Sequence, residues 1–251
     1  MSGYCQPPAP CPKPKPFYCE AVVVCADYDD FLRFTLPHNK CLFDRIVVVT
    51  AEHDKATRRL CEFYHVECVV SKELVPEKGK FCKGTGINKG LERLQLSDWA
   101  LHLDADIWLP PQTRILLERA ELDPTMIYGI DRFNVRGAKV WNEFLDAPVL
   151  QHENNTYIHT HAFPIGTRVM ISGRQGYVPI GFFQLWNPGE TGIKRYPQGH
   201  TGAGREDLLF TYNWPRRKRG FIPEIIAYHL ESDDAVMESN WKGRVTARFG
   251  L

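Results

Sequence analysis

Short apolar segments alternate with helix-like segments through the first hundred residues, and this alternation limits the folds open to the chain. Strand-like segments rich in valine, isoleucine and other apolar residues lie at 20–26, 45–50, 66–70 and 99–104. The segments between them favour helices at 29–36, 54–64 and 86–96. Pro37 should end the first helix, because the residue before a proline avoids the helical conformation, and Asp54 is placed to cap the second. Strands and helices in this order predict a parallel sheet with helices on both faces.

The second half of the chain is less regular. Its patterns favour helices at 113–121 and 140–145, and strands at 126–130, 157–164, 177–186 and 221–229. Residues 1–17 hold six of the eighteen prolines, which is typical of a flexible leader. We therefore expect a single α/β domain over residues 18–251 behind that leader.

The composition is typical of a soluble globular protein. Of the 251 residues, 43% are hydrophobic and 24% are charged, and the net charge of +1 gives no general attraction to nucleic acid or membranes. No apolar run approaches the ~18 residues of a transmembrane helix, and no signal peptide is evident. All eight cysteines lie in the first third without Cys-x2-Cys spacing, so we expect reduced thiols and a cytoplasmic protein.

The strand at 99–104 ends in the sequence Asp104-Ala105-Asp106. Side chains alternate along a strand, so the two carboxylates should share one side. Two carboxylates this close repel each other unless a cation or ligand lies between them, and Mg²⁺ usually binds one or two carboxylates plus substrate phosphates. In parallel sheets ligands bind beyond the carboxyl ends of strands, so 26–28, 50–54 and 104–106 should meet in one crevice. The pattern favours a metal clamp on a diphosphate, and a solvated turn remains the alternative.

The order of these parts over about residues 20–245 resembles the glycosyltransferases of the GT-A fold, especially the family-2-like inverting enzymes. The residues that carry the resemblance are Asp104-Ala105-Asp106, the upstream Ile87-Asn88-Lys89-Gly90-Leu91, the pair Glu206-Asp207, and His229. The resemblance implies a Rossmann-like, mostly parallel sheet flanked by helices, with a smaller mixed half on the acceptor side. It also implies a nucleotide-sugar-binding half at 18–108 and an acceptor-binding, catalytic half at 109–251.

The same resemblance implies a metal site and a general base. Asp104, Asp106 and His229 would hold Mn²⁺ or Mg²⁺, and imidazole suits Mn²⁺ better. Asp207 would be the base, with Glu206 as its neighbour in the family motif. A carboxylate within hydrogen-bond reach can take the proton of an acceptor hydroxyl as that hydroxyl attacks the anomeric carbon.

The family further implies a donor that is a UDP- or GDP-linked sugar. The matching donor-binding residues are Ala26, Tyr28, Glu52, Lys89, Asp104 and Lys242. Glu52 stands where the family often has Asp, which leaves the nucleobase open. Lys242 and Arg244 resemble the C-terminal loop that closes over the donor phosphates in the family.

These residues also have structural explanations. A histidine late in a strand, such as His229, can be satisfied inside the core. Glu206 and Asp207 are acids in a first helical turn, where the helix dipole favours them. His159 and His161 could share a strand face as metal ligands, although such pairs are more often polar lining.

Three other functions share part of the pattern. A haloacid-dehalogenase-like phosphatase also uses Asp-x-Asp and could use Asp233-Asp234, but that motif normally follows the first strand. A sugar nucleotidyltransferase should carry a glycine-rich loop after the first strand, and residues 26–32 contain no glycine. A nucleotide-sugar or carbohydrate-binding module would not need Asp207. The acceptor stays open, because the basic run at 216–219 suits a glycan, a lipid carrier or modified nucleic acid.

Overall fold

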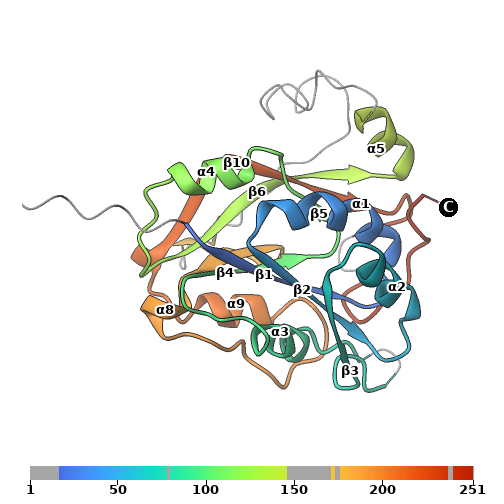
Figure 1. Ribbon diagram of the computed structural model, residues 1–251, viewed down its shortest axis with the longest axis horizontal. Helices are drawn as coiled ribbons and strands as arrows, with labels where there is room; N and C mark the ends of the chain where they lie inside the picture. The colour runs from blue at the N-terminus through green and yellow to red at the C-terminus, as the bar shows by residue number, and fades with distance from the viewer. Residues whose placement is uncertain (1–16, 78–79, 146–170, 173–175, 237–239, 251) are drawn as a thin grey trace, which may run out of the picture.

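The computed structural model describes residues 17–77, 80–145, 171–172, 176–236 and 240–250 (Figure 1). The expectations for the leader up to residue 16, and for the strand at 157–164 with His159 and His161, lie outside these residues. Within the described part of the chain, no helix has the length and apolarity needed to cross a membrane.

One eight-stranded sheet runs through the molecule in the order β3-β2-β1-β4-β9-β6-β10-β5. Its strands are β1 (Cys19–Cys25), β2 (Arg45–Ala51), β3 (Glu67–Ser71), β4 (Trp99–Asp104), β5 (Ile107–Trp108), β6 (Ile127–Arg136), β9 (Phe183–Trp186) and β10 (Arg219–Glu231). Strands β3, β2, β1 and β4 are parallel, as are β6 and β10, whereas β9 is antiparallel to both of its neighbours and β5 is antiparallel to β10. A separate hairpin pairs β7 (Ile171–Ser172) with β8 (Gly176–Tyr177).

Helices cover both faces of the sheet (Figure 1). The helices are α1 (Asp29–Asn39), α2 (Lys55–Phe63), α3 (Lys83–Leu91), α4 (Thr113–Arg119), α5 (Ala138–Leu145), α8 (Pro188–Thr191) and α9 (Glu206–Thr211). Along β1, Ala21 and Val23 pack on the side of α1, α2 and α4, while Val22 and Val24 pack on the side of α3 and α9. A third apolar cluster joins α5 to β6, β10 and the C-terminal segment. The expected fold class, α/β with a mostly parallel sheet flanked by helices, is confirmed.

The prediction that Pro37 ends the first helix is wrong, because α1 continues through Pro37 to Asn39. Long-range hydrogen bonds hold this last turn. The Asn39 amide donates to the carbonyl of Ile107 at 2.7 Å and accepts from the Leu109 N–H at 3.1 Å. His38 contacts the Leu109 carbonyl at 2.7 Å. These contacts offset the backbone hydrogen bond that the proline cannot make.

Other element boundaries also differ from the sequence expectations. Helix α3 covers Lys83–Leu91 rather than 86–96, and the segment expected as one strand at 177–186 is divided between β8 and β9. The expected cap of α2 is confirmed, since the Asp54 carboxylate accepts a hydrogen bond from the Thr57 N–H at 2.9 Å.

Candidate active site

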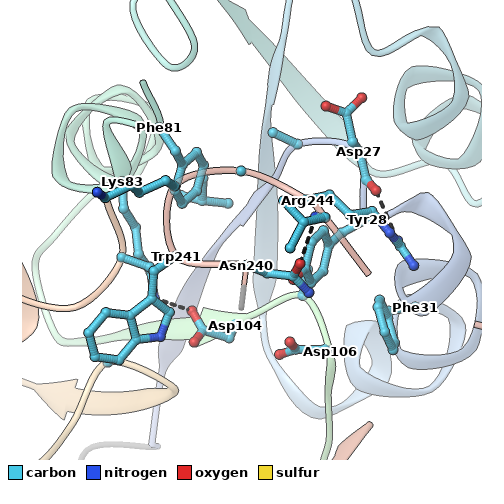
Figure 2. Close-up of a pocket in the computed structure, with 18 of the residues that line it drawn as sticks. Asp27, Tyr28, Phe31, Phe81, Lys83, Asp104, Asp106, Asn240, Trp241 and Arg244 are labelled. Carbon is cyan, nitrogen blue, oxygen red and sulfur yellow. Dashed lines mark hydrogen bonds and ion pairs between the residues drawn. The ribbon is translucent and has the colours of Figure 1, made fainter. Parts of the chain in front are cut away.

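A cavity of about 1010 Å³ opens where strand ends of the sheet meet (Figure 2). Ala26 and Tyr28 reach it from the end of β1, Asp104 and Asp106 from the end of β4 and the turn behind it, and His229 from β10. The sheet thus brings together residues that lie up to two hundred positions apart. This is the crevice beyond the carboxyl ends of parallel strands that the sequence predicted.

Asp104 is paired with a lysine that the sequence analysis missed. The ammonium of Lys83 lies 2.5 Å from Asp104 Oδ1, and its side chain is only 9% exposed. His102 Nε2 lies 3.4 Å from the same oxygen. Burial alone would raise the pKa of Asp104, but Lys83 and His102 hold that pKa well below its usual range. Burial opposes the charge of Lys83, but Asp104 and Asp207 raise the pKa of the lysine above its ordinary value.

Asp106 lies against His229. The distance from His229 Nε2 to Asp106 Oδ2 is 3.3 Å, and the Leu230 N–H donates to the Asp106 carbonyl at 2.9 Å. On its other side, His229 Nδ1 faces Asn134 Oδ1 at 3.3 Å and Glu231 Oε1 at 3.4 Å. Burial lowers the pKa of His229, whereas Asp106 and Glu231 raise it, and the net direction is upward. The imidazole is therefore fixed between acidic groups on both sides.

The residues present fit a divalent metal that relies on substrate for part of its shell. Asp106 Oδ1 is buried and has no hydrogen-bond partner in the described part of the chain, so it is free to bind a cation. The acceptors at Nδ1 of His229 orient the ring with Nε2 toward Asp106, as outer groups do for metal-bound histidines. Asp104 Oδ1 is already engaged by Lys83. Among the described residues, no group of three or more His, Cys, Asp or Glu is arranged to hold a metal alone.

Glu206 and Asp207 begin α9 but point to different places. Glu206 is 1% exposed, and its Oε2 accepts the Gly84 N–H at the start of α3. Burial raises the pKa of Glu206. Asp207 lines the cavity, where its Oδ2 accepts the Gly181 N–H at 2.8 Å and its Oδ1 accepts its neighbour's N–H at 2.7 Å. The structure therefore brings Asp207 into the cavity and holds Glu206 behind the cavity wall.

The residues expected to bind the donor fall into two groups. Those that line the cavity are Ala26, Tyr28, Asp104 and Lys242. Those that do not line it are Glu52 and Lys89. Glu52 pairs with Lys72 at 3.4 Å, and Lys89 pairs with Glu73 at 3.5 Å.

Asp27 and His53 form a further pair beside Tyr28, in two of the segments that the sequence predicted to meet in the crevice. Asp27 and His53 both line the cavity, with His53 Nε2 3.0 Å from Asp27 Oδ2. Asp27 has a backbone φ of 59°, which is uncommon for a residue with a side chain. The cavity therefore offers acidic and imidazole groups at the position where Glu52 was expected.

The C-terminal loop at 240–245 lines the cavity, and its two cations Lys242 and Arg244 have different contacts. Lys242 is exposed and lines the cavity. Arg244 also borders it, but its guanidinium forms a two-pronged ion pair with the buried carboxylate of Asp30. Arg244 is therefore committed to Asp30 (Figure 2), whereas Lys242 forms no ion pair with any residue that the structure describes.

Comparisons with known proteins give structural likenesses only. No protein-family model and no curated protein sequence matches the chain. Glucosyl-3-phosphoglycerate synthase from Mycobacterium tuberculosis in complex with phosphoglyceric acid is 13% identical, with a TM-score of 0.45 over 85% of this chain and 72% of that one. The same synthase in complex with Mn²⁺, UDP-glucose and phosphoglyceric acid is 14% identical, with a TM-score of 0.47 over 85% and 71% of the two chains. The chain is thus similar to this synthase in structure, at low sequence identity.

Proposed function

We propose that this chain is a metal-dependent glycosyltransferase of the GT-A type, which moves a sugar from a nucleotide-diphosphate donor to an acceptor hydroxyl. The observation that carries the proposal is one cavity that gathers three chemically different groups. They are the Lys83–Asp104 ion pair, the Asp106–His229 pair with its orphaned carboxylate oxygen, and Asp207.

The donor side of the cavity is built for a diphosphate. Asp106 and His229 would hold Mn²⁺ or Mg²⁺, which neutralises the charge that develops on the leaving diphosphate. Lys83 and Asp104 offer an ammonium and a carboxylate to the ribose and sugar hydroxyls. Tyr28 and Lys242, which also line the cavity, would complete the donor site. The nucleobase of the expected UDP- or GDP-linked donor, uracil or guanine, would lie toward Tyr28.

Asp207 would act as the base in a single inverting displacement. The acceptor hydroxyl gives its proton to the Asp207 carboxylate while its oxygen bonds to the anomeric carbon. The bond from that carbon to the diphosphate oxygen breaks, and its electron pair leaves with the nucleoside diphosphate. The backbone N–H groups of Gly181 and Leu208 fix the carboxylate and leave each oxygen a further lone pair for the hydroxyl.

One observation favours a binding module without transfer activity. Both oxygens of Asp207 accept backbone N–H groups, which is also what a purely structural carboxylate does. The phosphatase alternative has no such support, because Asp233 and Asp234 do not line the cavity and Asp234 accepts the Ala247 N–H at 3.0 Å. Our proposal leaves three acceptors open: a glycan, a lipid carrier or modified nucleic acid. It assigns the reaction to the cytoplasm, because the cysteine pattern favours reduced thiols.

The substitution Asp207→Asn tests the proposal. It keeps the shape of the carboxylate and one of its two backbone contacts but cannot take a proton, so turnover should fall on the order of 100-fold while donor affinity stays nearly unchanged and the melting temperature falls only modestly. Donors are screened by mass spectrometry of the released nucleotide, and binding is measured by calorimetry with Mn²⁺. Asp233→Asn is the control and should leave turnover unchanged.

Two results would count against the proposal. Full turnover in Asp207→Asn would remove the base and favour a binding or structural role for this carboxylate. A product that retains the configuration of the donor, seen by NMR of the anomeric proton, would exclude the single displacement.

A further inference from the structure

A chain of buried hydrogen bonds runs from His102 through Tyr196 and Gln184 to the backbone carbonyl of Asp207. We propose that Gln184 is a positioning residue that fixes the Asp207 carboxylate for proton transfer. This inference rests on the proposed function, because it concerns the base of that reaction.

The Gln184 amide ties together the supports of Asp207. It is fully buried on β9, and its Nε2 lies 2.9 Å from the Pro179 carbonyl, 3.0 Å from the Asp207 carbonyl and 2.8 Å from Thr211 Oγ1. Thr211 in turn donates its hydroxyl proton to the Pro179 carbonyl at 2.7 Å. One side chain therefore links the start of α9, the end of α9 and the loop before β9.

That loop is the segment that orients the base. Gly181 follows Pro179 by two residues, and its N–H donates to Asp207 Oδ2 at 2.8 Å. The approach is close, since a Cβ placed on Gly181 would lie 2.8 Å from the Asp207 Cβ. A shift of the loop or of α9 would therefore displace the carboxylate, and Gln184 holds both.

The orientation of the Gln184 amide follows from its partners. The carbonyls of Pro179 and Asp207 only accept hydrogen bonds, so the nitrogen must face them and Oε1 must face Tyr196. Tyr196 donates its single proton to this Oε1, and its oxygen then accepts from His102 Nδ1 at 3.2 Å. The hydrogen bonds thus run in one direction along the chain and leave one arrangement for the amide.

The two ends of the chain belong to paired strands. His102 on β4 and Gln184 on β9 are opposite each other in the antiparallel register, so their side chains leave the sheet on the same face. His102 Nε2 lies 3.4 Å from Asp104 Oδ1 on the donor side, and Gln184 bonds the Asp207 carbonyl on the acceptor side. The pairing therefore fixes the two halves of the site relative to each other.

The test compares Gln184→Met with Asn187→Leu. Met keeps the length of the side chain and removes its hydrogen bonds, whereas Asn187 is a buried amide just past the other end of β9 that bonds Asp98 and the Glu190 N–H. Gln184→Met should lower kcat on the order of 10- to 100-fold and change the donor Kd by less than about twofold. Asn187→Leu should lower the melting temperature and leave kcat unchanged. If Gln184→Met does not fold, Thr211→Val, which removes one of the groups that the amide binds, is expected to give the same split.

A double-mutant cycle separates positioning from stability. In the Asp207→Asn background, adding Gln184→Met should change the residual turnover by less than about twofold, because its effect passes through the lost carboxylate. If Gln184→Met lowers turnover equally in the wild type and in Asp207→Asn, the proposal is overturned. It is also overturned if the donor Kd rises as kcat falls. If Asp207→Asn is inactive while Gln184→Met and Thr211→Val are fully active, only the positioning role fails. Full activity in Asp207→Asn removes the base and the positioning role together.

Discussion

The guanidinium of Arg244 is expected to stabilise the fold rather than to bind donor phosphates. Its side chain is 9% exposed and forms two hydrogen bonds to the fully buried carboxylate of Asp30, which also accepts the Phe249 N–H at 2.5 Å. The guanidinium lies 5.2 Å from the ring centres of both Tyr28 and Phe31. Arg244→Ala removes the partner of a buried charge, so it should destabilise the protein.

The size of the loss follows from the burial of the pair. Removing one member of a buried ion pair costs about 3–5 kcal/mol, because the remaining charge is left without compensation. If the segment 240–250 detaches, Asp30 returns to water. The loss of folding stability then cannot exceed the free energy of that local opening. For a chain of this length the change corresponds to a fall in melting temperature on the order of 10 °C. Removing both partners should cost less than the sum of the single variants.

Melting and donor binding measured on the same variants distinguish the two roles. Arg244→Ala should melt earlier and expose 240–250 to limited proteolysis, which reports the opening of this segment directly. Lys242→Ala is the matched control, since Lys242 lines the cavity and is exposed. It should weaken donor binding and leave melting unchanged. An Arg244→Ala variant with normal melting and weak donor binding would refute the anchoring argument and assign the guanidinium to the phosphates.

Three further substitutions test separate parts of the cavity. Lys83→Met removes the partner of Asp104. The lost charged hydrogen bond is worth about 1.5–3 kcal/mol, so the donor Kd measured by calorimetry should rise on the order of 10- to 100-fold. An unchanged Kd would show that this pair only supports the fold. Gly181→Ala places a methyl group against Asp207 and should lower kcat while the donor Kd stays constant, and wild-type kinetics would mean that the carboxylate needs no such alignment. Asp106→Asn should raise the donor Kd on the order of tenfold with Mn²⁺ present and have little effect after EDTA treatment. Equal donor affinity with and without EDTA in the wild type would exclude the metal clamp.

The parallel half of the fold could be predicted because its signals are local. Each strand from β1 to β4 is a short apolar run, and the acidic residue ahead of α2 is a recognisable cap. The direction and neighbourhood of these strands then follow from the handedness of the crossovers. Asp104 and Asp106 could be assigned to the crevice because the carboxyl ends of parallel strands lie at one edge of the sheet. The position of His229 in the same site came from the family resemblance.

The second half could not be predicted as well because its structure depends on distant contacts. The segment at 177–186 is largely apolar and aromatic, yet it is divided because residues between β8 and β9 line the cavity and hold Asp207. The helix through Pro37 depends on Asn39 meeting the backbone of β5, about seventy residues away. Neither partner is visible in a local window of sequence.

Lys83 is a functional residue that the sequence prediction of a helix at 86–96 could not reveal, because its conflict with its surroundings is visible only in the structure. It stands at the first position of α3, where the positive end of the helix dipole disfavours a cation, and it is buried as well. Two unfavourable terms at one residue require a compensating anion, and Asp104 supplies it at 2.5 Å. Glu206 and Asp207 show the opposite case. The helix dipole favours acids at the start of α9, so the presence of these residues there does not indicate any further role. A residue that is unfavourable in its local environment therefore indicates a distant partner. Where the local environment favours a residue, only its contacts in the structure show whether it has a further role. By contact, Glu206 belongs to the packing of α3 and Asp207 to the cavity.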